Sequence, residues 1–444
     1  MFLTYQFKDD GEAKYRQLYS FIREDIERGR LAAETKLPSK RALARHLGIS
    51  VLTVENAYSK LAAEGYIAML EKRGSFVLAQ GQSNIEKSRN LLLDQKKKKS
   101  SKQEENQKYQ ENFPFATWAK CARKSLQMDR KALLTPTEAQ GSLVLRQAIS
   151  RYIRNFRGIE AEPEQIIIGA GAQILYTALV QILGREKIYA VENPSYPKIA
   201  AAYRSQGARV LAVNIDNYGV SSQKLNESRA SVLHISPNHQ FPSGVVMPIN
   251  RRYEILAWAN SGRGKFVVED DYDSEFRFDG EPLASLYSLD KSGKVIYGNT
   301  FSKTLSSTLR IAYLVLPIEL LEQYQNSFGI FSCTVSNFEQ LTLARFINNG
   351  YFEEHIKRMR NFYRIRREEV LQKFRNCPLA DECEIIEGQA GLHFVLQCKE
   401  DAAEFTGKAR AYGFNVRNIA DFYLDLQDKE NNQQVLLDYS NLED

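Results

Sequence analysis

Lys303 stands in a setting that suits it to chemistry. The stretch 297–313, YGNTFSKTLSSTLRIAY, surrounds this lysine with Ser and Thr hydroxyls and places Arg310 seven positions after it. Hydroxyls donate neutral hydrogen bonds to a phosphate, and a guanidinium donates charge-assisted ones. An amine beside such an anion cradle indicates an aldehyde cofactor that carries a phosphate. The alternative is a solvated lysine in a polar turn, because most lysines in proteins are exposed.

The flanking residues predict that Lys303 lies in a connection between two strands. A strand-like run over 294–297 leads into a Gly-Asn-Thr turn, and a second apolar run covers 311–316. Functional groups are often mounted on connections of this kind.

Asp270, 33 residues before Lys303, belongs to a run of acidic residues at the end of another apolar strand. A carboxylate in that position is the partner that a pyridinium nitrogen needs, because it keeps the ring protonated and electron-withdrawing. The neighbouring acids are Glu269, Asp271 and Asp273. We interpret these three as solvated.

The segments VVEDDYDSEFRF, HISPNHQFPSG and YGNTFSKTL resemble the fold-type I, aspartate-aminotransferase-like pyridoxal-phosphate proteins. More narrowly, they resemble the MocR subfamily of GntR-type bacterial regulators, and the resemblance covers nearly the whole chain apart from a linker. It implies that Lys303 forms a Schiff base with pyridoxal 5'-phosphate and that Asp270 pairs with the pyridine nitrogen. It also implies that Tyr272 bonds the ring hydroxyl, while Arg310 and Thr300 hold the phosphate.

Composition indicates a globular protein with more than one domain. The chain has 444 residues, is 43% hydrophobic and has no apolar run long enough to span a membrane. Its first residues, MFLTYQFKDD, do not have the pattern of a signal peptide. Five scattered cysteines without CxxC spacing indicate reduced thiols and argue against a zinc site. We therefore expect a cytoplasmic protein without a metal, and its net charge of +6 is compatible with nucleic acid.

Residues 1–79 have the pattern of a DNA-reading head. Apolar positions at helical spacing predict a first helix over 15–29. Ser39 is a candidate N-cap for a second helix over 40–47, and Ser50 is a candidate N-cap for a third. The second and third helices, joined at Gly48, indicate a helix-turn-helix.

Two β-prone runs flank Lys72-Arg73-Gly74 and predict a hairpin wing. With this wing, the segments LPSKRALARHLGIS and RGSFV resemble the GntR-type winged helix-turn-helix. The resemblance implies that the third helix enters the major groove of DNA. A helical bundle that docks another protein is the alternative.

The resemblance assigns DNA contacts to residues of the second and third helices and of the wing. The expected set is Ser39, Arg41, Arg45, Ser50, Thr53, Asn56, Lys60, Arg73 and Gly74. Its charged helix residues suit phosphates, whereas Thr53 and Asn56 suit base edges. Val51 stands where the family often has an arginine. Because valine can contact a thymine methyl but cannot read guanine, we expect a different operator sequence at that position.

Residues 80–112 are rich in Lys, Gln, Asn, Glu and Ser and include KKKKS at 96–100. Such a composition buries too little apolar area to fold alone, which predicts a flexible charged linker. The lysine run is then a solvated tether, and contact with DNA phosphates is the alternative.

Residues 113–444 alternate apolar strand runs with helical ones. Strand runs at 165–168, 187–191, 210–213, 231–235 and 266–268 are interleaved with helices that include 172–183 and 197–206. This alternation predicts a largely parallel sheet between helical layers, with ligands at the carboxyl ends of the strands. The expected fold class is α/β: the winged head, a large three-layer fold-type I domain and a small C-terminal α+β subdomain.

Several further residues of the body are candidates for cofactor contact. Gly171, Ala172 and Gln173 open a helix whose free amides can bind phosphate. Tyr196 follows the next strand, and the resemblance implies that it stacks on the cofactor ring; closing a core is the alternative. His239 lies in the loop that the resemblance places near the ring hydroxyl. Phe241 occupies the place of an aminotransferase asparagine, so that asparagine's direct contact is not expected here.

Arg417 and Lys198 are candidates for binding an effector carboxylate. A surface role is the alternative for Arg417. Family members that bind an amino-acid carboxylate can carry arginine at the position of Lys198, so the lysine weakens any assignment of γ-aminobutyrate as effector.

Three hypotheses from different classes remain. The chain is a transcription regulator that senses through pyridoxal phosphate, an active aminotransferase with an appended DNA-binding head, or a DNA binder with a vestigial cofactor site. The presence of Lys303, Asp270, Tyr272 and Arg310 argues against the third. The head favours the regulator, because a catalyst gains nothing from a groove-reading helix. We therefore expect a homodimeric regulator that binds double-stranded operator DNA and senses pyridoxal phosphate itself, an amine or an amino acid.

Overall fold

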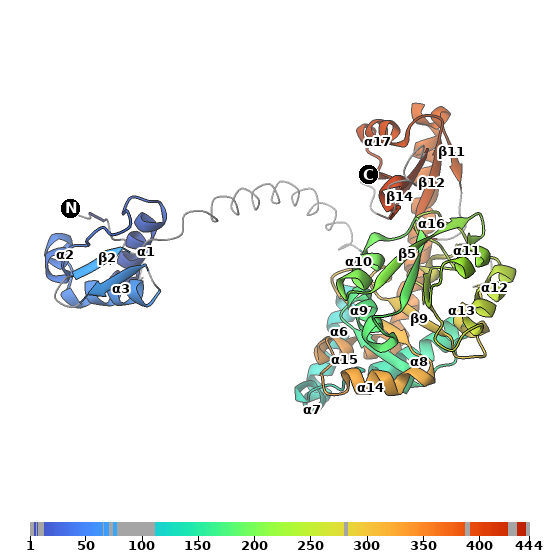
Figure 1. Cartoon of the computed structure of the whole chain (residues 1–444), viewed down its shortest axis with the longest axis horizontal. Coiled ribbons are helices and arrows are strands. Elements are labelled where there is room, and N and C mark those ends of the chain that lie inside the picture. The colour runs from blue at the N-terminus through green and yellow to red at the C-terminus, as the bar shows by residue number, and fades with distance from the viewer. Residues whose placement is uncertain are drawn as a thin grey trace. The chain divides into compact units, whose positions relative to one another are not determined.

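The chain divides into two compact units, residues 1–104 and 105–444, which are described separately (Figure 1). The computed structural model describes residues 4–5, 7, 13–64, 66–70, 74–77, 112–278, 283–386, 391–424 and 433–440. The expected linker, apart from Asn112, and Arg73 of the expected wing lie outside these residues.

The described residues of the first unit form three helices followed by a hairpin. Its elements are α1 (Lys14–Glu27), α2 (Lys40–Leu47), α3 (Val51–Ala63), β1 (Ile67–Leu70) and β2 (Gly74–Val77), with β1 and β2 antiparallel. Ser39 and Ser50 accept hydrogen bonds from the backbone amides of Ala42 and Thr53, so both cap helices as predicted. Gly48 ends α2 in the left-handed conformation, with φ of 65°.

The core of the first unit forms between α1 and α3. Leu18 and Ile22 of α1 pack with Val54 and Tyr58 of α3, and all four are fully buried. The opposite face of α3 stays exposed, as the predicted entry of this helix into the major groove would require.

An eight-stranded sheet organises the second unit, in the order β3-β10-β9-β8-β7-β4-β5-β6. The strands are β3 (Ile166–Gly169), β4 (Ile188–Asn193), β5 (Arg209–Asp216), β6 (Gly219–Val220), β7 (Val232–Ile235), β8 (Phe266–Asp270), β9 (Val295–Thr300) and β10 (Ala312–Val315). Among the described strands of this sheet, only β6 and β10 run antiparallel to their neighbours, which confirms a largely parallel sheet.

The connection that carries Lys303 begins later than predicted. Gly298, Asn299 and Thr300 form the end of β9 and pair with β10, so they are strand rather than turn. Lys303 nevertheless lies between β9 and β10, as expected.

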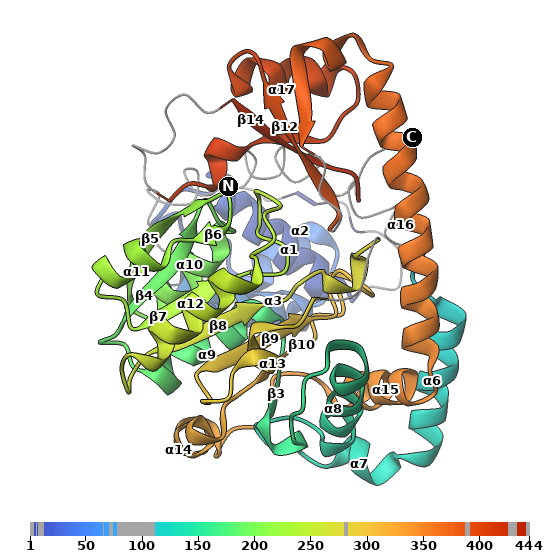
Figure 2. The ribbon, with the colours of Figure 1, turned by 90° about the vertical axis from the view of Figure 1, so that its right-hand side faces the viewer.

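Helices cover both faces of the sheet (Figure 2). Successive side chains of β3 point to opposite faces of the sheet and so belong to two different hydrophobic cores. Ile166 and Ile168 pack with α8 and α15, whereas Ile167 packs with α9 and α10. The helices of the large domain are α6 (Phe115–Met128), α7 (Arg130–Leu134), α8 (Leu143–Arg157), α9 (Ala172–Leu183), α10 (Pro197–Ser205), α11 (Ser222–Glu227), α12 (Ile249–Asn260), α13 (Leu286–Leu289), α14 (Leu321–Phe328) and α15 (Asn337–Asn348).

The long helix α16 (Tyr351–Arg375) leads from the large domain to a smaller C-terminal subdomain (Figure 2). That subdomain has a sheet in the order β11-β12-β14-β13 and one further α-helix. Its elements are β11 (Cys383–Ile386), β12 (His393–Cys398), α17 (Ala402–Ala411), β13 (Val416–Asn418) and β14 (Gln434–Asp438). This is the α+β subdomain that the sequence predicts.

A search of the described helices finds none that is long and apolar enough to cross a membrane.

Candidate cofactor site and nucleic-acid interface

The predicted cofactor residues gather at one edge of the large sheet. Because β10 is antiparallel to both β3 and β9, these two strands run in the same direction as β8, β7 and β4. The carboxyl ends of all five strands therefore lie at a common edge. Asp270 is the last residue of β8, and the residues that follow the other four ends are Gly171, Lys303, His239 and Tyr196.

Gly171 and Arg310 form the wall of an anion cradle. Gly171 precedes α9 with φ of 93°, and a Cβ added there would stand 2.8 Å from Cζ of Arg310. Arg310 itself has a left-handed backbone, with φ of 53°, which is unusual for a residue with a side chain. The guanidinium thus lies directly against the amino end of α9, where free amides favour an anion.

Hydroxyl groups complete this cradle from the neighbouring strand. Ala312 of β10 pairs with Gly169 on one side and with Thr300 on the other. Thr300 Oγ1 and Ser302 Oγ are 2.9 Å apart, at the start of the Lys303 connection. Amides, a guanidinium and hydroxyls are the donors that a phosphate group accepts from, so these residues fit the phosphate of pyridoxal phosphate. Ala172 is half-buried and Gln173 is exposed in the first turn of α9.

The acidic run divides between the two faces of β8, because side chains alternate along a strand. Asp270 points to the face of α9 and α10, with a side chain that is 13% exposed. Glu269 and Asp271 point the other way and are 0% and 2% exposed. The expectation that Glu269, Asp271 and Asp273 are solvated is therefore wrong, since Asp273 is also buried.

Each of these buried acids has a structural partner. Glu269 accepts 2.9 Å hydrogen bonds from the amides of Leu286 and Tyr287 at the start of α13. Asp271 lies 2.9 Å from Nε of Arg157, which is buried in the same layer. Sequence patterning missed Arg157 because it lies on a helix 114 residues before Asp271, and nothing local marks the pair.

Asp270 has two polar neighbours on its own face of the sheet. The Tyr176 hydroxyl forms a hydrogen bond with it, and burial followed by the charge of Asp270 raises the pKa of Tyr176 well above its usual value. His234 Nε2 lies 3.7 Å from Asp270 Oδ2. Neither neighbour was predicted.

Tyr272 and His239 meet directly. The Tyr272 hydroxyl lies 3.1 Å from His239 Nδ1, and the same nitrogen lies 2.8 Å from Asp273 Oδ2. Burial, with the charges of Asp273 and Asp270, raises the pKa of Tyr272 well above 10, so its hydroxyl stays protonated. A protonated phenol can donate to an ionised ring hydroxyl of a bound cofactor.

The C-terminal subdomain reaches this edge through His393. Its ring centroid is 4.7 Å from that of His239, and its Nε2 lies 3.1 Å from the carbonyl oxygen of Pro242. Burial, with the charges of His239 and Lys303, lowers the pKa of His393 well below 6.5, so the imidazole is neutral. Lys303, which is half-buried, thus lies within electrostatic reach of the subdomain.

Tyr196 is 42% exposed and does not close a core. Its ring stands edge-on to Phe241, with centroids 5.9 Å apart. Lys198 and Arg417 are exposed, and Lys198 Nζ lies 5.6 Å from the centre of the Tyr196 ring. The charge of Arg417 contributes to lowering the pKa of His393, which places it on the same side. Their role toward an effector stays a prediction.

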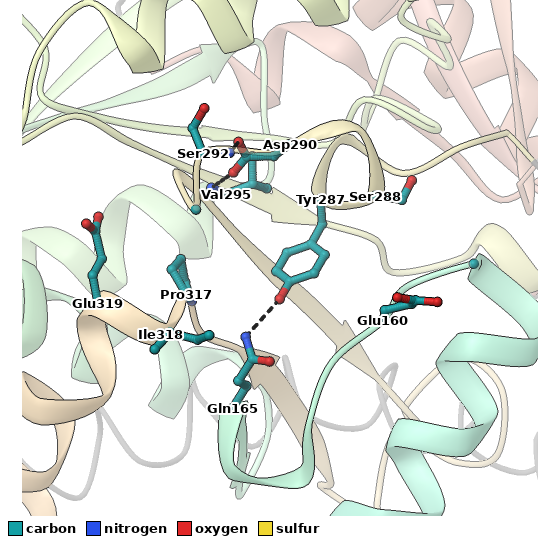
Figure 3. A pocket seen from close by; sticks show the side chains of 12 residues that line it. Glu160, Gln165, Tyr287, Ser288, Asp290, Ser292, Val295, Pro317, Ile318 and Glu319 are labelled. Carbon is teal, nitrogen blue, oxygen red and sulfur yellow. Dashed lines mark hydrogen bonds between the residues drawn. The ribbon is translucent and has the colours of Figure 1, made fainter.

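A cleft of about 540 Å³ lies at the opposite edge of the sheet (Figure 3). It opens beside the amino ends of β3 and β9, where Gln165 Nε2 donates to the Tyr287 hydroxyl at 3.2 Å. Glu160, Asp290 and Glu319 also line it. Because it sits at the amino ends of the strands, this cleft is separate from the site around Lys303.

The candidate DNA interface lies on α2 and α3. Arg41, Arg45 and Asn56 are exposed, as contact with DNA requires. Lys60 is exposed too, but its Nζ lies 4.2 Å from the centre of the Tyr19 ring, a cation–π contact within the head. Val51 is 44% exposed at the start of α3.

The hydroxyls in this predicted DNA set are engaged in capping. Ser39 and Ser50 accept from helix amides, and Thr53 Oγ1 lies 2.8 Å from Ser50 Oγ. Gly74 begins β2 with φ of 110°. DNA contact by this set stays a prediction.

These two units define a class of protein: a winged helix-turn-helix joined to a body with an aminotransferase fold. Residues 103–431 match the family described as "Aminotransferase class I and II", and residues 14–77 match "Bacterial regulatory proteins, gntR family". A solved structure of Pyrococcus horikoshii kynurenine aminotransferase in complex with PMP has a TM-score of 0.65 at 23% identity. It covers 75% of this chain and 84% of that one.

Two curated relatives extend over both units. An uncharacterised HTH-type transcriptional regulator of Bacillus subtilis, YdeL, is 36% identical over 420 residues, which are 91% of this chain and 89% of the relative. The probable rhizopine catabolism regulatory protein MocR of Rhizobium meliloti is 31% identical over 407 residues, 87% and 82% of the two chains. The chain belongs to the aminotransferase class I and II family and to the MocR-type HTH transcription regulators, which combine such a body with a gntR-family head. Pyridoxal 5'-phosphate is the cofactor of this body.

Proposed function

We propose that this regulator senses its effector, which is pyridoxal phosphate itself, an amine or an amino acid, at the edge that carries Lys303. The observation that carries the proposal is the anion cradle of Gly171 and Arg310 at the same sheet edge as Lys303 and Asp270. When bound, the cofactor supplies an electrophilic aldehyde that amines can attack.

Each residue has a distinct part in holding the cofactor. The Lys303 amine would hold the aldehyde carbon, and Arg310 with the α9 amides and the Thr300 hydroxyl would hold the phosphate. Asp270 would oppose the pyridine nitrogen as a carboxylate. Tyr272, kept protonated by burial, would donate to the ring hydroxyl with His239 behind it.

Sensing requires that an effector favour one conformation of the body over another. The contact of His239 with His393 supports such coupling, because it joins the cofactor edge to the C-terminal subdomain. Lys198 and Arg417 are the candidates for an effector carboxylate. Typical coupling energies of about 1–3 kcal/mol predict a change in operator affinity of roughly 5- to 150-fold.

An exposed apolar face of the body supports a homodimer. Leu134 is 82% exposed on α7, and Ile330 is 90% exposed in the loop before α15. The amino end of α15 adjoins the end of α7, since Asn337 Nδ2 donates to the carbonyl oxygens of Ala132 and Thr135. Large apolar side chains this exposed are candidates for a protein contact, and a second copy would let two heads read two half-sites.

The deciding experiment separates binding, sensing and turnover. Borohydride reduction of the loaded protein followed by peptide mapping should label Lys303, and the Lys303→Ala variant should lose the label. Operator affinity is then measured at fixed salt with no ligand, with pyridoxal phosphate and with a panel of amines. A label on another lysine would reject Lys303 as the site of cofactor attachment. The same operator affinity with no ligand, with pyridoxal phosphate and with every amine would reject sensing. Sustained formation of keto acids would instead establish the aminotransferase alternative.

A further inference from the structure

A buried chain of polar side chains reaches Asp270 from the side of the sheet that α10 covers. His234 on β7 pairs in register with Val268 on β8, so its side chain lies on the same face as Asp270, two residues further along. The imidazole is 2% exposed, and its Nε2 stands 3.7 Å from Asp270 Oδ2. On the other side of the ring, Nδ1 lies 2.7 Å from the hydroxyl of Tyr203, a residue of α10 that is 0% exposed.

The direction of the hydrogen bond between Tyr203 and His234 depends on the His234 tautomer. Burial raises the pKa of Tyr203 well above 10, with Tyr189 and Asp270 acting in the same direction, so Tyr203 carries its proton. Its hydroxyl can therefore donate to Nδ1 of His234. A neutral imidazole that accepts at Nδ1 carries its own proton at Nε2. That N–H then faces the Asp270 carboxylate.

His234 Nε2 is a buried nitrogen without a hydrogen-bond partner at normal distance. Buried polar groups are nearly always satisfied, so an orphaned donor beside a carboxylate calls for an explanation. Nε2 stands 3.7 Å from Asp270 Oδ2, and an approach of about 0.8 to 1 Å would close a charge-assisted bond to this carboxylate.

We propose that Tyr203 is a positioning residue that acts through His234, fixing its tautomer so that Nε2–H holds the Asp270 carboxylate ionised and oriented toward a bound pyridine ring. The inference rests on the proposed function, because it gives Asp270 a cofactor to face. It adds two residues of no assigned role, one on β7 and one on the face of α10 that packs against the sheet. The Tyr176 hydroxyl is the second donor to the same carboxylate.

The test begins with the protein free of cofactor. The chain has five histidines, so ¹⁵N-histidine labelling gives few signals, and His234→Gln assigns the relevant one. We expect wild-type His234 to carry its proton on Nε2 and none on Nδ1. Tyr203→Phe, which keeps the buried ring, should shift that signal toward exchange between the two tautomers. A wild-type His234 protonated at Nδ1 would overturn the inference.

The second arm measures the affinity for pyridoxal phosphate by its bound absorbance. Tyr203→Phe and His234→Gln should each weaken binding about five- to tenfold, the scale of one buried hydrogen bond. The double variant should bind no more weakly than His234→Gln alone, because one residue acts through the other. Tyr189→Phe is the matched control: this hydroxyl is bonded to the Gly184 carbonyl oxygen, and its ring centroid lies 4.8 Å from that of Tyr203. It should bind as wild type does.

Two failures are distinguishable. Wild-type affinity in Tyr203→Phe, or additive losses of affinity in the double variant, would reject the proposal that Tyr203 acts through His234. Neither result would contradict the cofactor site itself. A wild type that binds no pyridoxal phosphate would reject the proposed function and the inference together.

Discussion

The guanidinium of Arg310 packs against the backbone of Gly171, at the amino end of α9, where any side chain on residue 171 would collide with it. Both residues have positive φ, 93° for Gly171 and 53° for Arg310. A strained arginine held against a glycine is a costly arrangement, and such strain persists where the surrounding structure enforces it. Its benefit is a guanidinium fixed beside free helix amides.

Gly171→Ala should therefore weaken pyridoxal-phosphate binding by more than tenfold, because the new Cβ displaces Arg310 from the cradle. Cofactor titration monitored by absorbance measures the loss. Gly158→Ala is the control, since Gly158 also has a positive φ of 62° but open space around it. That variant should lose about 1 kcal/mol of stability and keep its affinity. Equal affinity in both variants would remove the cradle from the binding site.

Asp270→Asn should keep the fold and weaken cofactor binding about tenfold or more, because a neutral amide does not balance a pyridinium charge. Glu269→Gln, on the adjacent residue, gives the contrast. Glu269 faces away from Asp270 and caps α13, so its replacement should lower the melting temperature and leave affinity unchanged. The assignment of Asp270 does not survive if the two variants bind the cofactor alike.

The sequence predicted the organising features of this protein because local patterns encode them. Capping serines and the αL glycine set the bounds of α2, and the strand–helix alternation set the parallel sheet. The resemblance to fold-type I proteins identified the candidate cofactor-binding residues at the edge of the sheet. A long-range pair such as Arg157 with Asp271 leaves no local signal, and for that reason sequence patterning predicts solvated acids over 269–273 where the structure buries them.

Stability should fall as pH rises from about 5 to 8, and Glu192 should cause part of the fall. Burial raises its pKa from 4.5 to about 8, while hydrogen bonds from Ser236 and Gln240 lower it only in part. A raised folded-state pKa gives stability that is complete below the unfolded value and is lost as pH rises through the folded value. Glu269 and Glu275, raised to about 7, act in the same direction.

Glu192→Gln should reduce this pH dependence by an amount on the order of 2–4 kcal/mol, because glutamine cannot ionise. Denaturant unfolding at several pH values measures it for both proteins. Parallel stability curves for wild type and variant would show that Glu192 is ionised in the folded protein throughout.

Leu134→Asp combined with Ile330→Asp should convert the proposed homodimer to a monomer, since the new charges would have to be desolvated in the proposed contact. Both side chains are exposed in the single chain, at 82% and 90%, so the fold should tolerate the change. Ile386→Asp is the control, an exposed residue of the C-terminal subdomain at 45%. Sedimentation at micromolar concentration gives the mass, and a double variant that remains dimeric would place the interface elsewhere.

Variants of the DNA-binding head should distinguish residues that contact phosphates from residues that contact bases. Arg45 is exposed at the end of α2. Arg45→Ala should therefore weaken binding to all DNA sequences alike and make the slope of log K against log[salt] shallower by about 0.9. Asn56, exposed on α3, should instead read a base edge, and Asn56→Ala should cost about 1–3 kcal/mol on the operator while leaving non-specific binding unchanged. Lys60→Ala should have the smaller effect, because its ammonium already rests on Tyr19. Binding to operator and to random duplex at three salt concentrations measures all three variants. If Arg45→Ala and Asn56→Ala lose affinity with the same salt slope and the same sequence dependence, α3 is not the groove-reading helix.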